Sequence, residues 1–384
     1  MYLILVKQDY DSKLSFHFLF TFFSLSFHFL FTLFFIFSAF SFFAQGTTVY
    51  SPQLINNTAP FPGESCASEY AENEFLKDPA YAQTRANFEA QIQQYIQQNS
   101  GSRAAGVVYT IPAVFHVMHS GEAIGDLTNI SYAQALSCIN ALNRDLRRTA
   151  ADGGIANSGP LVVDAEIEFC MAQRDPNGNA TTGVTRHDMS GDQDYLDSGV
   201  YHTAALWRSD FSMKSSVNWY NTQYMNVWVV NKIRNLNNIY SSGGYSGGVQ
   251  GYAYFPGAPS PYDGVVMVSS AVGNDPTGAL GYNLWGPTDD NRVFTHEVGH
   301  YLNLYHTFSG TDSCTQVTPC ATGGDRCCDT PVTTVGAGNN CTAPVCPLDN
   351  KENYMQYQNG SCASDFTPDQ LACFSWINLL LRKL

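Results

Sequence analysis

The sequence predicts an α+β fold, in which a mixed, twisted sheet with flanking helices is followed by an irregular C-terminal part held by disulfides. Three observations lead to this prediction. Runs of β-branched and apolar residues alternate with helical segments from residue 107 onward. Glycine- and serine-rich stretches separate these runs, as loops do. Eight of the eleven cysteines lie in the last quarter of the chain, where few apolar residues could otherwise hold the loops together.

The first 45 residues are interpreted as a targeting segment and are excluded from the fold. Lys7 and Lys13 precede a long run rich in phenylalanine and leucine, which is the arrangement of a signal peptide. The apolar run is longer than an ordinary signal core, so an uncleaved membrane anchor is the alternative. We expect cleavage, hence a secreted, extracellular protein without stable membrane association.

Residues 46–103 are predicted to form a separate pro-segment. The stretch from Ser68 to Gln98 is rich in alanine, glutamate and glutamine, which favours helix, and a polar break follows it. A removable segment of this kind suits an enzyme that must stay inactive until export. The alternative is an N-terminal helical extension.

From residue 107 the predicted elements follow one another as strands and helices. Residues 107–119 read as a strand, and apolar residues at helical spacing predict a helix over 129–148. Further strands are predicted at 161–169, 226–230, 251–255 and 264–269. The strand at 251–255 is either an ordinary member of the sheet or an edge strand that pairs with an extended substrate.

Composition limits the partners of the chain. The formal net charge is -14 and no run of lysine and arginine is present, which argues against nucleic acid as a ligand. The dense cysteines indicate disulfides made in an oxidising compartment. A second, structural zinc site is the weaker alternative, because no Cys-x-x-Cys ligand spacing occurs.

The chemistry that the sequence indicates lies in the stretch HEVGHYLNLYH, from His296 to His306. Residues four apart share one helix face, so His296 and His300 can direct their imidazoles at one metal ion. His306 needs a sharp turn at the helix end to reach the same ion. Asn303 is the candidate pivot, because asparagine readily adopts the left-handed backbone conformation. This spacing predicts a Zn²⁺ site with three histidine ligands.

Glu297 follows the first histidine and is predicted to lie beside the fourth coordination position, where a catalytic zinc site keeps a water molecule. A carboxylate there can take a proton from the water that attacks a peptide carbonyl and deliver it to the leaving amine. The alternative is a catalytically inactive extracellular binding module, stabilised by zinc. A structural site is normally closed by a fourth protein ligand and needs no base, so Glu297 favours the enzyme.

Downstream, residues 353–357 read NYMQY, and here the chain resembles the pappalysin branch of the metzincin zinc endopeptidases. The resemblance covers most of the chain after residue 107, and the zinc-binding stretch is its most specific part. Asn303 departs from the general metzincin pattern, which has glycine there. The resemblance implies that Met355 forms a Met-turn beneath the zinc ligands and that Tyr357 stabilises the oxyanion of the reaction.

The resemblance also implies a domain organisation and a function. An upper catalytic subdomain at 104–306 would end in the zinc helix, which lies above the sheet. A lower subdomain at 307–384 would carry the Met-turn, the disulfides and a C-terminal helix. For that helix the residues themselves predict a capping box, with Thr367 and Gln370 bonding reciprocally. The implied function is that of a secreted zinc metalloendopeptidase acting on protein or peptide substrates.

The cysteines receive separate predictions. The resemblance implies the disulfides Cys314–Cys346 and Cys341–Cys362. Cys138 and Cys170 are a plausible further pair, which would leave Cys66 alone in the pro-segment. A lone thiol there suggests a cysteine switch, in which the thiolate takes the zinc position that water needs. The alternative is a cysteine that is simply free.

Family members bind calcium in the lower subdomain, which makes Ca²⁺ a second candidate metal. Asp325 and Asp329 are candidate ligands by this resemblance. Two acidic residues in a loop are also consistent with ordinary solvation.

Overall fold

The protein is described by a computed structural model, and every described residue belongs to a unit that runs from Pro52 to Leu384. The structure describes residues 66–99, 108–148, 164–201, 210–234, 240–242, 249–310, 313–314, 320, 323–331, 333–334, 346, 350, 352–357 and 363–381. The predicted signal peptide or anchor, residues 1–45, lies outside these residues.

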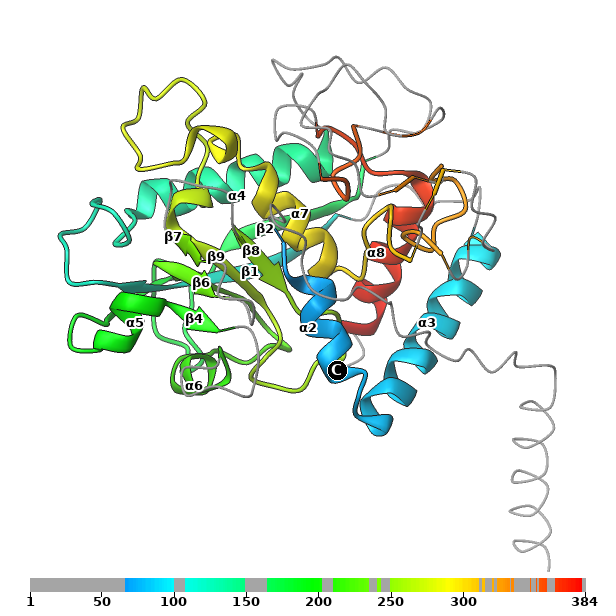
Figure 1. The fold of residues 1–384 in the computed structure, drawn as a ribbon, viewed down its shortest axis with the longest axis horizontal. Coiled ribbons are helices and arrows are strands. Elements are labelled where there is room, and N and C mark those ends of the chain that lie inside the picture. The colour runs from blue at the N-terminus through cyan, green and yellow to red at the C-terminus, as the bar shows by residue number, and fades with distance from the viewer. Residues whose placement is uncertain are drawn as a thin grey trace, which may run out of the picture. The chain divides into compact units, whose positions relative to one another are not determined.

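The centre of the fold is a six-stranded mixed sheet with the main order β2-β1-β5-β9-β8 (Figure 1). Its strands are β1 (Tyr109–His119), β2 (Ile167–Met171), β3 (Val184–Asp188), β5 (Met225–Val230), β8 (Gly251–Ala253) and β9 (Val265–Val268). Along one edge of β1 lie β2 and then β3, both parallel to it, and β5 lies parallel to the other edge. β9 is parallel to β5, whereas β8 is antiparallel to β9 and ends this path. The predicted mixed sheet is thus confirmed.

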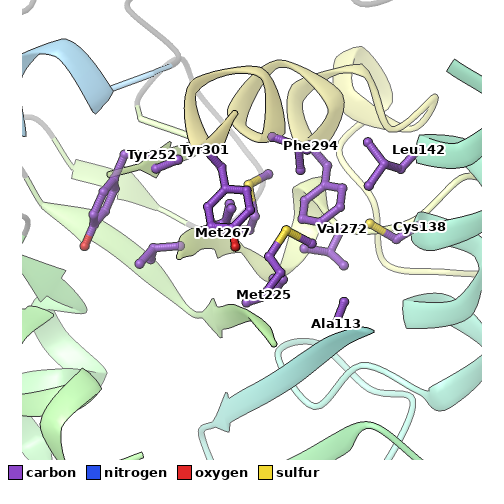
Figure 2. Packing of buried hydrophobic residues seen from close by; sticks show 14 of the residues in the cluster. Ala113, Cys138, Leu142, Met225, Tyr252, Met267, Val272, Phe294 and Tyr301 are labelled. Atoms are coloured by element: carbon purple, nitrogen blue, oxygen red, sulfur yellow. The ribbon is translucent and has the colours of Figure 1, made fainter. Parts of the chain in front are cut away.

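One face of the sheet is covered by two helices, α4 (Tyr132–Arg147) and α7 (Arg292–Tyr301). Figure 2 shows Phe294 of α7 and Leu142 of α4 directed toward the sheet, where Ala113 and Met225 lie. All four side chains are fully buried. Removing this apolar surface from water stabilises the position of α7 on the sheet.

The remaining elements of the upper part are short. A second, three-stranded sheet has the order β4-β6-β7. Its strands are β4 (Val200–Tyr201), β6 (Lys232–Arg234) and β7 (Tyr240–Ser242). The short helices are α5 (Gln193–Ser198) and α6 (Asp210–Ser216), and the 3₁₀ helices are η1 (Ser269–Ala271) and η2 (Gly286–Thr288).

The N-terminal stretch predicted to be mostly helical forms two helices, α2 (Ser68–Phe75) and α3 (Pro79–Asn99). Pro79 is the first residue of α3. Proline is tolerated there because backbone N–H groups in the first turn of a helix have no acceptor within the helix. The two helices are joined by a buried ionic contact, because Arg85 of α3 bonds Glu72 of α2 at 2.7 Å. Glu89 of α3 bonds the same guanidinium at 3.1 Å.

The C-terminal part has few regular elements among the described residues and ends in α8 (Pro368–Leu381), which lies beside α3 (Figure 1). The predicted capping box is confirmed: the Thr367 N–H donates to Gln370 Oε1 at 2.8 Å, and the Gln370 N–H donates to Thr367 Oγ1 at 3.4 Å.

Disulfides cross-link this part of the chain. The bond Cys314–Cys346 is present, as the resemblance implied. A second bond, Cys320–Cys328, joins two of the cysteines that the sequence alone did not pair. Cys341 and Cys362, the other implied pair, lie outside the described residues.

The predicted pair Cys138–Cys170 is wrong, because both cysteines are free. Cys138 is fully buried on α4 and lies among the core side chains of Figure 2, where Asn291 hydrogen-bonds to it. Cys170 lies on β2 between two buried residues and is itself half-buried. Its side chain therefore points to the opposite face of the strand from Phe169 and Met171, which pack into the core.

Among the residues that the structure describes, no helix has both the length and the apolar character needed to cross a bilayer.

The close packing beneath α7 leads to a first prediction. A Cβ at Gly299 would collide with the sulfur of Met355, which is fully buried. Overpacking of a core costs about 1–3 kcal/mol, and alanine returns at most about 1 kcal/mol in helix propensity over glycine. We expect Gly299→Ala to lower the free energy of unfolding by on the order of 1 kcal/mol, measured by denaturant titration.

Gly191→Ala is the matched control, because a Cβ there meets nothing within 4 Å. Its stability should stay within about 0.5 kcal/mol of the parent protein. Equal stability of the two variants would contradict the packing argument.

Candidate metal centre

The centre is built on α7 and on the sharp turn that ends it. His296 and His300 are one helical turn apart and share one face of α7. The helix ends because Asn303 takes φ 80°, the left-handed conformation predicted for it. The Leu304 N–H then donates to the Gly299 carbonyl at 2.9 Å, which closes the turn. The chain thereby returns under the helix.

This turn brings the third histidine to the other two. The Nε2 atoms of His296, His300 and His306 lie 3.2 Å from one another in all three pairs. A tetrahedral ion with bonds of about 2.0–2.1 Å to nitrogen requires its ligand atoms about 3.3 Å apart. All three histidines are buried, at 6%, 0% and 2% exposure.

The second nitrogen of each ring is held by the protein. Nδ1 of His296 contacts the Tyr354 carbonyl at 2.6 Å, and Nδ1 of His300 contacts the Leu304 carbonyl at 2.6 Å. Because a carbonyl can only accept, both Nδ1 atoms carry the proton and both Nε2 atoms present a lone pair. Burial lowers the pKa of His296 to about 3, and it also lowers the pKa of His300 well below its usual value. Both rings are neutral, which is the form that binds metals.

Cys66 contributes a fourth atom to the same place. Its sulfur and the three Nε2 atoms all lie within 4.8 Å of one another. Two neutral imidazoles with convergent lone pairs, a third imidazole and a thiol make a donor set that suits zinc. The residues present therefore fit a metal ion. Burial, followed by the charge of Glu297, raises the pKa of the thiol well above its usual value, although hydrogen bonds with Ser68 act in the opposite direction.

The backbone at Cys66 is held against the end of the large sheet. Cys66 forms a parallel bridge with Gly251 of β8, and the Ala67 N–H donates to the Gly251 carbonyl at 3.2 Å. The Ala253 N–H donates to Ser68 Oγ at 2.8 Å. The N-terminal stretch thus uses hydrogen-bonding groups of β8 that face away from β9.

Glu297 is fully buried and contacts Cys66, whose sulfur lies with the three histidine nitrogens. Its Oε2 accepts hydrogen bonds from Ser68 Oγ at 2.9 Å and from Cys66 Sγ at 3.3 Å. Its Oε1 is buried and has no hydrogen-bond partner among the described residues. Burial raises the pKa of Glu297 to about 8. Gly251 leaves the space that the carboxylate uses, because a Cβ there would lie 2.9 Å from Glu297 Cγ.

Met355 and Tyr357 surround the histidines from the C-terminal part. The Met355 side chain is fully buried and packs against α7 at Gly299. The Tyr357 ring lies 4.7 Å from the His306 ring and 6.0 Å from the His296 ring, centroid to centroid. Its hydroxyl donates to the Cys66 carbonyl at 3.3 Å.

Two residues of the centre were missed by the sequence analysis. Ser68 contacts Glu297, and Glu69 contacts His306, whose Nδ1 lies 2.8 Å from Glu69 Oε1. Both belong to α2, more than 200 positions before their partners. Neither has a local pattern that marks it, because each contact arises only when α2 docks beside α7.

The two acidic residues considered as calcium ligands, Asp325 and Asp329, accept hydrogen bonds from other groups of the protein. Asp325 accepts hydrogen bonds from the Cys327 N–H at 3.0 Å and from Gln370 Nε2 at 2.6 Å. Asp329 accepts from Thr367 Oγ1 and from the Asp369 N–H. In the described part of the chain, Cys66 and the three histidines are the group whose ligand atoms could hold a metal.

Comparison with known proteins finds a matching peptidase family and named relatives. The sequence model of a peptidase family described as pregnancy-associated plasma protein-A matches residues 209–375. An extracellular metalloprotease of Colletotrichum graminicola is 38% identical over 136 residues, which are 32% of this chain and 42% of that protein. Another, from Arthroderma benhamiae, is 27% identical over 278 residues, covering 71% of this chain and 77% of that protein. The chain thus spans less than half of the first relative.

Two solved structures from Tannerella forsythia are also similar to this chain. A promirolysin mutant has a TM-score of 0.58 at 27% identity and covers 81% of this chain and 92% of its own. Mature mirolysin in complex with a cleaved peptide has a TM-score of 0.51 at 30% identity, covering 70% of this chain and 91% of its own. The match over nearly the whole of mature mirolysin agrees with the family model and with the named relatives. The chain therefore belongs to the pappalysin family of metalloproteases, as the resemblance of its sequence indicated.

Proposed function

We propose that this protein is a secreted zinc endopeptidase that is made as an inactive proenzyme. The observation that carries the proposal is the convergence of three Nε2 atoms at 3.2 Å, with the Glu297 carboxylate beside them. His296, His300 and His306 would hold the ion. Zinc, when bound there, supplies a Lewis acid that polarises the scissile carbonyl and acidifies water.

Glu297 is proposed as the general base. Its buried, unpartnered Oε1 would take the proton of the attacking water, and the same group would then deliver it to the leaving amine. Tyr357 is proposed to stabilise the oxyanion, because its hydroxyl bonds the backbone of Cys66, the residue whose sulfur lies with the histidine nitrogens.

The substrate is proposed to be a protein or peptide that pairs with β8. This strand is antiparallel to β9 on one side, and its other side now bonds the segment at Cys66. An extended peptide can use the same backbone groups once that segment leaves. The complex of mature mirolysin with a cleaved peptide supports this class of ligand.

Residues 46–103 are proposed to be the pro-segment, and Cys66 to be its inhibitory ligand. The thiol lies within 4.8 Å of the three histidine nitrogens, where it would take the place that a water molecule needs, and Ser68 bonds the carboxylate that would activate the water. The promirolysin match covers more of this chain than the mature mirolysin match, 81% against 70%, which supports the presence of a pro-segment.

Secretion is proposed from the targeting segment and from relatives that are named extracellular. The division into an upper subdomain at 104–306 and a lower one at 307–384 is proposed on the same family resemblance. Calcium remains a prediction from that resemblance.

Glu297→Gln tests the base. The change keeps the shape of the side chain and the metal ligands but removes the proton acceptor. We expect kcat/KM for a quenched peptide to fall about 10²–10⁴-fold, while the zinc content of the activated enzyme, measured by atomic absorption, stays at one ion per chain.

Glu168→Gln is the matched control, because its carboxylate pairs with Arg147 away from the centre and is partly exposed. It should retain activity. Persistent hydrolysis by zinc-loaded Glu297→Gln would exclude Glu297 as the base, and an inert wild-type enzyme with zinc bound would favour the binding module instead.

Cys66→Ala tests the inhibitory ligand. Removal of the thiol should raise peptide hydrolysis by the uncleaved proenzyme on the order of tenfold or more, because the open state of the centre is no longer opposed by a sulfur–metal bond. Electrophoresis before and after the assay shows whether the pro-segment remained attached.

Cys170→Ala provides the comparison, since this free cysteine lies on β2 outside the centre. It should leave the proenzyme latent. If the Cys66→Ala proenzyme is as inactive as the wild-type proenzyme, the thiol does not contribute to inhibition.

A further inference from the structure

The three histidines differ in what orients them. His296 and His300 are held at Nδ1 by carbonyls of Tyr354 and Leu304, which are backbone groups of the proposed catalytic part. His306 is held at Nδ1 by a side chain, the carboxylate of Glu69, at 2.8 Å. Glu69 lies on α2, within the proposed pro-segment.

The Glu69 side chain is held firmly at His306 by burial and by several hydrogen bonds. The residue is 4% exposed. Besides the His306 ring, its Oε1 accepts a hydrogen bond from the His306 backbone N–H at 2.8 Å and another from Ser309 Oγ. One carboxylate oxygen thus holds both the ring and the backbone of His306. It also holds Ser309, three residues further along the chain.

His306 has the greatest need of such a contact. The other two histidines stand on α7, where helical hydrogen bonds restrict their backbone. His306 lies beyond the turn at Asn303 and has no helix to hold it. Acceptors on the second nitrogen of a ligating histidine set its tautomer and orientation, and their loss commonly weakens metal binding about 10–100-fold.

We propose that Glu69 is a positioning residue for the third metal ligand, so that the pro-segment completes the metal centre and strengthens its hold on the ion. The proposal rests on the proposed function. Under it, the uncleaved protein binds zinc more tightly than a protein with an unsupported His306, and the metal is best loaded before the pro-segment is removed. The pro-segment would then orient a metal ligand through Glu69 and inhibit the same centre through Cys66.

The test measures zinc affinity on the folded, uncleaved protein by competition with a chromophoric chelator. All variants carry Cys66→Ala, so that the sulfur adds nothing. Glu69→Ala should weaken zinc binding about 10–100-fold. Glu69→Gln keeps an acceptor oxygen and should recover part of the loss. Glu74→Ala is the matched control on the same helix, because Glu74 is partly exposed and pairs with Lys77.

A second measurement separates positioning from general structural support. The d–d absorption of Co²⁺ bound in place of zinc should change in Glu69→Ala and not in Glu74→Ala, because only the former alters the ligand geometry. Equal zinc affinity and equal Co²⁺ spectra of the two variants would overturn the proposal. Failure of the Cys66→Ala parent to bind zinc at all would instead contradict the proposed metal centre. If Glu69→Ala does not fold, Glu69→Gln and Ser309→Ala carry the comparison.

An independent observation concerns two cysteines of the C-terminal part. Cys327 lies in a loop, and Cys373 lies on α8. Their sulfurs are 4.0 Å apart, and the residues are only 3% and 4% exposed. Cys328, the neighbour of Cys327, is already bonded to Cys320. The contact therefore sits beside an existing cross-link, with no intervening group between the two thiols.

We infer that Cys327 and Cys373 form a further disulfide in the secreted protein. The two thiols lose two protons and two electrons and form one sulfur–sulfur bond. The electrons pass to the disulfide of a thiol–disulfide oxidoreductase of the secretory compartment, which becomes a dithiol. The bond would tie α8 to the loop that carries Arg326, whose guanidinium bonds Glu89 of α3 at 3.2 Å.

Peptide mapping by mass spectrometry tests this bond on secreted protein that is alkylated under denaturing conditions without reduction. We expect the peptide with Cys327 and Cys328 to be linked to both the Cys320 peptide and the Cys373 peptide. In Cys373→Ser, Cys327 should become alkylated, whereas Cys170→Ser should leave it protected. Alkylation of both Cys327 and Cys373 in the wild-type protein, or a bond from Cys327 to another cysteine, would overturn the inference.

Discussion

Three imidazole nitrogens lie 3.2 Å from one another in a buried site, and the surrounding structure is arranged to keep them there. Lone pairs at this distance repel unless a cation lies between them. The arrangement therefore depends on the groups that fix each ring, namely two backbone carbonyls and one carboxylate. The same requirement explains the turn at Asn303, since only a left-handed residue there ends α7 and returns the third ring to the first two.

The N-terminal segment meets this centre through three nearly consecutive side chains with different partners. Cys66 approaches the histidine nitrogens, Ser68 bonds the Glu297 carboxylate, and Glu69 bonds His306. Backbone pairing with β8 sets the register that gives each side chain its partner. A single strand-edge contact therefore brings one side chain to the histidine nitrogens, one to the proposed base and one to the third histidine. The buried guanidinium of Arg85 adds to this docking, because it donates to the Pro256 carbonyl at 3.1 Å and to the Tyr305 hydroxyl at 3.0 Å.

The cysteine pairs predicted from the sequence agree only in part with those of the structure. Cys314–Cys346 agrees with the family resemblance, whereas the proposed pair Cys138–Cys170 is wrong. The two cysteines of that pair belong to a neighbouring helix and strand, but Cys170 lies on the strand face opposite to the core. The alternation of β2, with Phe169 and Met171 in the core, turns Cys170 away from it, and the predicted pairing of the two cysteines did not take this into account. Cys320–Cys328 and the contact of Cys327 with Cys373 likewise appear only when the loop folds onto α8.

The sequence by itself determined the features that depend on near neighbours. The spacing of His296 and His300, the turn at Asn303 and the capping box at Thr367 are local, because helix and turn geometry relate residues a few positions apart. The main strands and α4 followed from periodicity in the same way. Tertiary structure alone decided the contacts of Glu69 with His306 and of Cys66 with Glu297, which span more than 200 residues. It also decided the strand order, because many pairings satisfy the same apolar pattern and only packing of the whole core selects one.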